Sequence, residues 1–161
     1  MKKMRLYLET SVISQLNAPD RPDWMAETLR LWKELEADRY EAIVGEPVVA
    51  EIKKCYEPKR TFMLDKVKEM VKTMVGETDE AKRIANEYIR QGGLKRKSAT
   101  DALHIALATL ANCDFVVSWN CRHIVNVNAM SAVEAVNFRE GFRLIKLVTP
   151  TIFMEGQSDE F

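Results

Sequence analysis

The sequence predicts an α/β fold, a three-layer α/β/α sandwich around a mainly parallel central sheet. Short apolar segments of strand length alternate along the chain with longer segments of helical periodicity, which is typical of parallel strands joined by crossover helices. The segment 99–112 is apolar nearly all round, as expected of a helix that packs deep against a sheet. No internal repeat, low-complexity tract or linker interrupts this alternation. We therefore expect one domain over residues 1–155 and a disordered tail over residues 156–161.

The first half of the chain contains two predicted strands and two predicted helices. An apolar strand over 4–8 stops at Glu9, and the hydroxyl groups of the next two residues can cap a following helix. Apolar residues recur at helical spacing over 23–38, which indicates an amphipathic helix. A second strand is predicted over 41–44, and Pro47 suits the first position of the helix that follows it.

The second half repeats the alternation. Residues 58–90 are helical in pattern and rich in charge, with a break at 76–79. The remaining predicted elements are the buried helix over 99–112, a continuous apolar strand over 115–118, a helix over 130–140 that Gly141 ends, and a last strand over 144–148.

The overall charge excludes one class of nucleic-acid-binding protein. The 161 residues include 24 basic and 24 acidic side chains, for a formal net charge of zero. Such a balance argues against binding through bulk positive charge. Basic residues are nevertheless in excess over residues 53–97 and acidic residues over the rest. This basic region is either a solvated charged face or a local surface for RNA.

Cysteine content and hydropathy bear on the location of the protein. The three cysteines are an odd number in a chain that can bury a sizeable core, which indicates reduced thiols and a cytoplasmic location. No apolar run approaches the roughly 18 residues that a membrane span needs. We therefore expect a soluble protein that does not bind membranes.

Polar side chains stand where the predicted strands end. Glu9 follows the first strand and Asn120 follows the strand at 115–118, and the carboxyl edge of an open parallel sheet is where sites form. Asp101 lies in the first turn of the buried helix and Glu51 lies early on its helix, so both can face the same edge. Glu9 directly after a buried strand costs stability unless it is solvated or bound.

Three carboxylates in one crevice would repel one another unless a cation lies among them. Hard oxygen ligands in that number suit Mg²⁺ or Mn²⁺, which complete their coordination with waters and substrate phosphate. The sequence therefore predicts a magnesium or manganese site formed by Glu9, Glu51, Asp101 and Asn120.

Three of these residues also have simpler interpretations. Asp101 can complete a capping box with Ser98 at the start of its helix. Glu51 can pair with Lys54 on a solvated helix face. Asn120 can be an ordinary turn residue.

The two histidines and the cysteines suggest other chemistries. His104 lies three residues after Asp101 on the buried helix, so a core histidine that donates to a neighbouring carbonyl is the better interpretation. His123 lies near the rim of the predicted site, where it can contact phosphate or support its own loop. A zinc site with Cys113 and Cys121 is disfavoured, because the C-x7-C-x-H spacing is not a usual zinc pattern.

Four segments in order resemble one family. The segments are YLETSVI (7–13), VVAEI (48–52), TDALHIALA (100–108) and DFVVSWNCRHI (114–124). Together they resemble the PIN domain, particularly the VapC-type toxins of bacterial toxin–antitoxin pairs. The stretch from Asn137 to Gly141 and the closing LVTPTIFME (147–155) resemble the C-terminal region of that family, so the resemblance covers nearly the whole chain.

The resemblance implies a PIN-like fold and a metal-dependent ribonuclease. It places the acidic positions of the family on Glu9, Glu51 and Asp101, and the family's Thr-x-Asp element on residues 118–120. It also implies an antitoxin partner, an RNA substrate and a homodimer. Two departures follow: Glu9 is one methylene longer than the usual Asp, and Asn120 removes a negative charge. A single metal ion, or a second ion that arrives with RNA, is then more plausible than a preformed pair.

These considerations define the expected roles. The predicted metal ligands and catalytic residues are Glu9, Glu51, Asp101 and Asn120, and the predicted substrate-binding residues are Ser118, Lys95, Arg96, Lys97 and His123. We expect metal-assisted hydrolysis of an RNA phosphodiester, with Mg²⁺ or Mn²⁺ lowering the pKa of a bound water. The alternative is a degenerate PIN-like module that binds RNA or a protein without cleavage.

Overall fold

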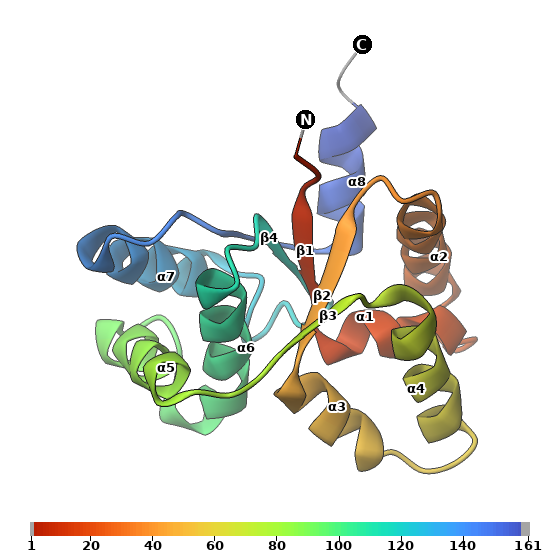
Figure 1. Cartoon of the computed structure of the whole chain (residues 1–161), viewed down its shortest axis with the longest axis horizontal. Helices are drawn as coiled ribbons and strands as arrows, with labels where there is room; N and C mark the ends of the chain where they lie inside the picture. The colour runs from red at the N-terminus through yellow and green to blue at the C-terminus, as the bar shows by residue number, and fades with distance from the viewer. Residues whose placement is uncertain (1, 159–161) are drawn as a thin grey trace.

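The computed structural model describes residues 2–158 (Figure 1). Its centre is a five-stranded sheet with the strand order β3-β2-β1-β4-β5. The strands are β1 (Arg5–Leu8), β2 (Glu41–Gly45), β3 (Thr73–Val75), β4 (Phe115–Val117) and β5 (Lys146–Val148). Each neighbouring pair is parallel. The predicted fold class is confirmed.

Helices cover both faces of the sheet. They are α1 (Thr10–Ser14), α2 (Pro22–Glu36), α3 (Glu46–Lys53), α4 (Lys59–Met70), α5 (Asp79–Gln91), α6 (Ala99–Leu110), α7 (Val127–Glu140) and α8 (Pro150–Ser158), with 3₁₀ turns η1 (Gln15–Asn17) and η2 (Arg96–Ser98). Figure 1 shows α5, α6 and α7 on one side of the strands, and α1, α2, α4 and α8 on the other. Within residues 2–158 no helix is both long enough and apolar enough to cross a bilayer.

The central strand β1 explains the position of the site. Leu6, Tyr7 and Leu8 are fully buried, as expected of a strand covered on both faces. β1 lies between β2 and β4, with Leu8 in register with Val117. The backbone N–H of Glu9 continues this ladder by donating to the carbonyl of Val117 at 3.1 Å. Glu9 is therefore held at the carboxyl edge of the sheet.

Helix α6 brings a second set of side chains to that edge. Small residues, among them Ala102, Ala106 and Ala108, are fully buried and let the helix pack closely on the sheet. The predicted capping box at its start is absent, because the side chain of Ser98 makes no capping hydrogen bond. The Ser98 hydroxyl instead lies 3.3 Å from Nδ1 of His123.

Two elements differ from the sequence prediction. Strand β3 falls inside the region predicted as helical, and its signal is weak because it is a three-residue edge strand with Met74 54% exposed. Helix α8 continues through Ser158, where a tail was predicted from residue 156. Phe153 anchors this helix by packing edge-on against Tyr40 and Phe115. Residues 159–161 of the predicted tail lie outside the described residues.

Candidate metal and nucleic-acid site

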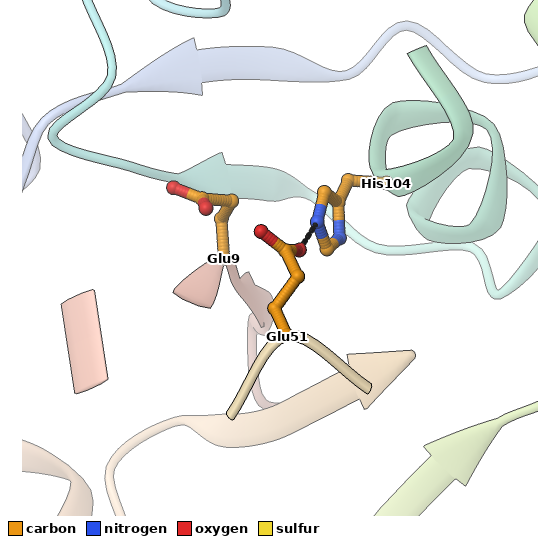
Figure 2. Close-up of side chains that lie close together, drawn as sticks. All are labelled: Glu9, Glu51 and His104. Carbon is orange, nitrogen blue, oxygen red and sulfur yellow. Dashed lines mark hydrogen bonds and ion pairs between the residues drawn. The ribbon is translucent and has the colours of Figure 1, made fainter. Parts of the chain in front are cut away.

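The structure gathers the predicted acidic residues at the carboxyl edge of the sheet. Glu9 follows β1, Glu51 lies on α3, which follows β2, and Asn120 follows β4, while Asp101 lies in the first turn of α6. They divide into two adjacent groups. One contains Glu9, Glu51 and His104, with one potential ligand atom from each within 4.8 Å of the others (Figure 2). The other contains Asp101 and Asn120.

The carboxylate of Glu9 is held by serine hydroxyls. Its Oε1 accepts from the hydroxyl of Ser11 at 2.6 Å and from the hydroxyl of Ser118 at 2.6 Å. Its Oε2 accepts from the backbone N–H of Ser11 at 3.2 Å, so Glu9 itself caps α1. The prediction that the hydroxyls of residues 10 and 11 cap this helix is wrong. Glu9 is only 5% exposed, and its hydrogen bonds offset the cost of burying the charge.

Glu51 is fixed by one imidazole and one hydroxyl. Nε2 of His104 lies 2.5 Å from Oε1 of Glu51, and the hydroxyl of Thr10 donates to the same oxygen at 3.1 Å. Oε2 of Glu51 has no hydrogen-bond partner among residues 2–158 in the structure. Glu51 is thus part of the site and not of a solvated pair with Lys54.

His104 completes a chain of buried hydrogen bonds. Its Nδ1 lies 2.7 Å from the hydroxyl of Tyr7, and both residues are fully buried. In the neutral imidazole with Nε2 donating to the Glu51 carboxylate, Nδ1 accepts from the Tyr7 hydroxyl, whereas in the protonated ring both nitrogens donate. The prediction of a core histidine is right about burial but wrong about its partner, which is a carboxylate of the site and not a carbonyl. The i+3 spacing from Asp101 was the available signal, since it places both residues on one helix face.

The environment shifts the pKa of Glu51 and Tyr7 in opposite directions. Burial by itself raises the pKa of Glu51, but the hydrogen bond and charge of His104 and the bond from Thr10 outweigh it and hold the pKa below its usual value. Burial raises the pKa of Tyr7 well above its usual value, and the negative charges of Glu9 and Glu51 add to this, against a hydrogen bond from the backbone of Gly45. Glu51 is therefore ionised at neutral pH, and Tyr7 keeps its proton.

Asp101, unlike Glu51, has a pKa above its usual value. Burial, followed by the charge of Glu9, raises its pKa, and Glu51 adds a smaller contribution. Its Oδ1 accepts from the side-chain amide of Asn120 at 3.4 Å. The Asn120 side chain also accepts, through Oδ1, from the backbone N–H of His123 at 3.0 Å. Asn120 is thus oriented by its loop and directs its amide at Asp101.

Ser118 is buried against the carboxylate of Glu9. It is fully buried, its hydroxyl donates to Glu9, and it accepts from the backbone N–H of Asn120 at 2.9 Å. The neighbouring Trp119 donates its backbone N–H to the hydroxyl of Ser11 at 2.9 Å. This arrangement favours a role for Ser118 in positioning Glu9 over direct contact with a substrate.

The predicted basic residues lie beside this edge and split between two hollows. Lys95, Lys97 and His123 line one pocket, and Arg96 lines another with Arg90. Lys95, Arg96 and Lys97 are exposed, and His123 is half-buried. The structure thus brings Lys95, Lys97 and His123 together and directs Arg96 elsewhere.

The donor set fits a hard divalent cation. Glu51 offers a carboxylate oxygen with no partner among the described residues, and burial, followed by the charge of Glu9, raises the pKa of Asp101 and so disfavours its charged form. A cation among these carboxylates would relieve that repulsion. Carboxylate oxygens with room for water are the ligands that Mg²⁺ and Mn²⁺ prefer. The predicted cysteine candidates for zinc, Cys113 and Cys121, do not belong to this group.

Comparisons with known proteins show the fold. No protein-family model matches the sequence, and no curated protein matches it. A chain of VapBC2 from Rickettsia felis, solved bound to a DNA fragment from the promoter, matches with a TM-score of 0.56 and 16% identity over 91% of this chain and 98% of that one. VapC20 from Mycobacterium tuberculosis, a Sarcin-Ricin loop cleaving toxin, matches with a TM-score of 0.50 and 17% identity over 69% of this chain and 86% of that one.

These matches and the strand order define the class of the fold. The chain is an α/β/α sandwich with carboxylates at the carboxyl edge of a parallel sheet. It has the fold of the VapC toxins, as the resemblance to PIN domains implied.

Proposed function

We propose that the protein is a metal-dependent endoribonuclease that hydrolyses RNA phosphodiesters. The observation that carries this proposal is the cluster of Glu9, Glu51 and His104 at the carboxyl edge of the sheet, with Asp101 near enough that burial and then the charge of Glu9 raise its pKa. The fold of the toxins described above supports the same activity.

Mg²⁺ or Mn²⁺ is the proposed cofactor, with Glu51 and Asp101 as its main ligands and Glu9 and Asn120 beside them. When bound, such an ion lowers the pKa of a water molecule and neutralises charge on the phosphate. His104 and Thr10 fix the Glu51 carboxylate in one orientation before substrate arrives. Asn120 orients water or a phosphate oxygen through its amide.

A single ion fits these residues better than a preformed pair. Both oxygens of Glu9 already accept hydrogen bonds, which leaves this carboxylate less free to bind a metal directly. Asn120 adds no negative charge. Glu9 then acts mainly through its charge and through the loop that carries Ser118 and Asn120.

RNA is the proposed substrate, and Lys95, Lys97 and His123 are its proposed contacts, whereas Arg96 faces a separate hollow. The exposure of Lys95 and Lys97 beside the acidic edge supports local binding by a protein whose net charge is zero. Basic side chains there would offset the repulsion between RNA phosphates and the carboxylates.

We further propose that the protein is the toxin of a toxin–antitoxin pair and acts in the cytoplasm as a homodimer. One matched chain comes from a VapBC structure, which supports an antitoxin partner. Exposed Phe138 on α7 supplies apolar surface for association. Light scattering on the purified chain and co-purification with the product of a neighbouring gene test these two assignments.

One observation favours a second function, a module that binds RNA without cleaving it. The Glu9 carboxylate is saturated by Ser11 and Ser118, and Asn120 stands where the related family carries an acid. Titration of Mg²⁺ or Mn²⁺ with an RNA cleavage assay, on the wild type and Glu9→Ala, separates the two functions. Metal-dependent cleavage that the variant loses supports the nuclease, whereas binding without cleavage supports the module.

A further inference from the structure

We propose that the pocket between residues 93–98 and 122–128 is a phosphate-binding subsite, which holds a backbone phosphate of the RNA strand beside the acidic edge. The proposal rests on the proposed ribonuclease function and adds to it a defined binding position. It also adds Arg122, which lies outside the predicted basic segment, to the residues that contact RNA.

The pocket has room for a phosphate group and a lining of basic side chains. Its volume is about 400 Å³, and its walls include Lys95, Lys97, Arg122 and His123. No acidic residue lines it. By contrast, the hollow around Arg96 includes Glu87, and the hollow at the opposite end of the sheet includes four acidic residues. This pocket is therefore a concentrated positive site in a neutral protein.

Lys95, Lys97 and Arg122, which line this pocket, form no ion pairs with acidic residues among residues 2–158. The arginines with an acidic partner are Arg5, Arg21, Arg30, Arg39, Arg60, Arg83, Arg90, Arg139 and Arg143. Among residues 2–158, Arg96 and Arg122 are the arginines that form no ion pair. Lys95 and Lys97 also form none with any described residue. Unpaired cations that share one pocket are available to bind an anion.

The local backbone is built to form this pocket. A Cβ atom on Gly93 would lie 2.1 Å from the carbonyl oxygen of Asn128, so glycine lets the 93–98 segment touch the first turn of α7. Asn126 caps that helix by accepting from the N–H of Ala129 at 2.9 Å. Its amide also donates to the carbonyls of Cys121 and Arg122, which fixes the loop that carries Arg122. The first turn of α7 contains no acid and adds its positive dipole to the lining.

Hydrogen bonds connect the pocket with the acidic edge. Nδ1 of His123 lies 3.3 Å from the hydroxyl of Ser98, and its backbone N–H donates to Asn120. Asn120 in turn donates to Asp101. A phosphate in the pocket would therefore lie beside the loop that positions Asn120 against Asp101, and we expect the position of cleavage to depend on this contact.

Binding of RNA without metal tests the subsite separately from cleavage. Anisotropy of a short fluorescein-labelled oligouridylate is measured in EDTA over a range of salt concentrations. Lys97→Ala and Arg122→Ala are compared with Arg96→Ala, which removes the same charge from the neighbouring hollow. All three side chains are exposed, and melting temperatures confirm that the variants fold.

We expect Lys97→Ala and Arg122→Ala each to weaken binding several-fold. Each should lower the slope of log affinity against log salt by about 0.7, the value for one lost phosphate contact on a single strand. Arg96→Ala should change both quantities much less. Equal effects of all three variants, or no measurable binding by the wild type, would overturn the subsite.

Failure of the subsite and failure of the nuclease are distinguishable. If the variants bind like the wild type and the wild type cuts RNA with Mg²⁺, the subsite is wrong and the nuclease stands. If binding falls as expected but the wild type cuts nothing at any Mg²⁺ or Mn²⁺ concentration, the nuclease is wrong and the subsite stands.

Discussion

Nε2 of His104 lies 2.5 Å from Oε1 of Glu51, and this contact joins the buried helix α6 to the acidic edge of the sheet. The other ring nitrogen is held by Tyr7 from the central strand. The Glu51 carboxylate is therefore oriented by side chains that cannot move without disturbing the core. Oriented carboxylates bind metals more tightly, because less order must be imposed when the ion arrives.

Replacing His104 tests this orientation. His104→Leu removes both hydrogen bonds, so we expect Mn²⁺ affinity to fall by about 10-fold to 100-fold. His104→Gln retains an N–H donor at the distance of Nε2 and should recover much of that loss. Electron paramagnetic resonance of free Mn²⁺ measures the affinity without any cleavage assay. Equal Mn²⁺ affinity in both variants and the wild type would show that His104 has no positioning role.

A substitution of Gly45 tests the close packing around Tyr7, the residue that contacts His104. A Cβ atom there would lie 2.6 Å from the hydroxyl oxygen of Tyr7 and 2.8 Å from Cδ1 of Leu107. We expect Gly45→Ala to lower the free energy of unfolding by about 1–3 kcal/mol, because neither neighbour can move freely in the core.

Gly156→Ala is the matched control for this substitution. Gly156 is exposed on α8, and a Cβ atom there meets nothing within 4 Å. Alanine at that position should leave stability unchanged or raise it by about 0.5–1 kcal/mol. Urea denaturation measures both variants, and a Gly45→Ala protein as stable as Gly156→Ala would contradict the close packing of Tyr7.

Asp101 should make stability depend on pH. Its pKa in the folded protein is raised, first by burial and then by the charge of Glu9, so its contribution to stability is fully present below its unfolded value near 4 and is lost as pH rises through the folded value. Asp101→Asn removes this loss. In EDTA we expect the variant to melt a few degrees above the wild type at neutral pH, with a smaller difference in acid.

Added Mg²⁺ supplies the control for this pH effect. The ion should raise the melting temperature of the wild type and leave Asp101→Asn nearly unchanged, because the variant has lost the charge that holds it. A wild type that melts above Asp101→Asn in EDTA at neutral pH would contradict the proposed repulsion.

Thr28 connects helix α2 to the loop that carries Ser118 and Asn120. Its buried hydroxyl accepts from Nε1 of Trp119 at 2.9 Å and donates to the carbonyl of Trp24 at 2.6 Å. Thr28→Val leaves the indole N–H unpaired in the core, and we expect a loss of about 1–3 kcal/mol. Thr28→Ser keeps the hydroxyl and should lose less. The rings of Trp24 and Trp119 stack at 4.6 Å, so tryptophan fluorescence reports the change.

Strong local patterns made most of the fold predictable. The short apolar run of β1 and the nearly all-apolar sequence of α6 are strong local patterns. β3 was not predicted because this edge strand, with Met74 exposed, buries too few apolar side chains to give a strand pattern in the sequence. α8 was not predicted because Phe153 stabilises it by packing on Tyr40 and Phe115, which are distant in sequence.

The candidate site was predictable in composition but not in its contacts. Glu9 and Asn120 follow buried strands, and that position alone places them at the edge of the sheet. The bond between His104 and Glu51 spans 53 residues, and that between His104 and Tyr7 spans 97. No helix periodicity encodes such pairs. The sequence pattern of a capping box at Ser98 is present, but the Ser98 hydroxyl contacts His123 instead of capping α6.

We propose that Asp101 and its acidic neighbours hold a metal ion that supports RNA hydrolysis. Cleavage of a structured RNA is therefore measured against Mg²⁺ concentration for the wild type and Asp101→Asn, whose melting curves show that both are folded. We predict cleavage by the wild type that depends on Mg²⁺ and is abolished by EDTA, and none by Asp101→Asn at any Mg²⁺ concentration. Full cleavage by Asp101→Asn, or cleavage by the wild type that persists in EDTA, would contradict the claim.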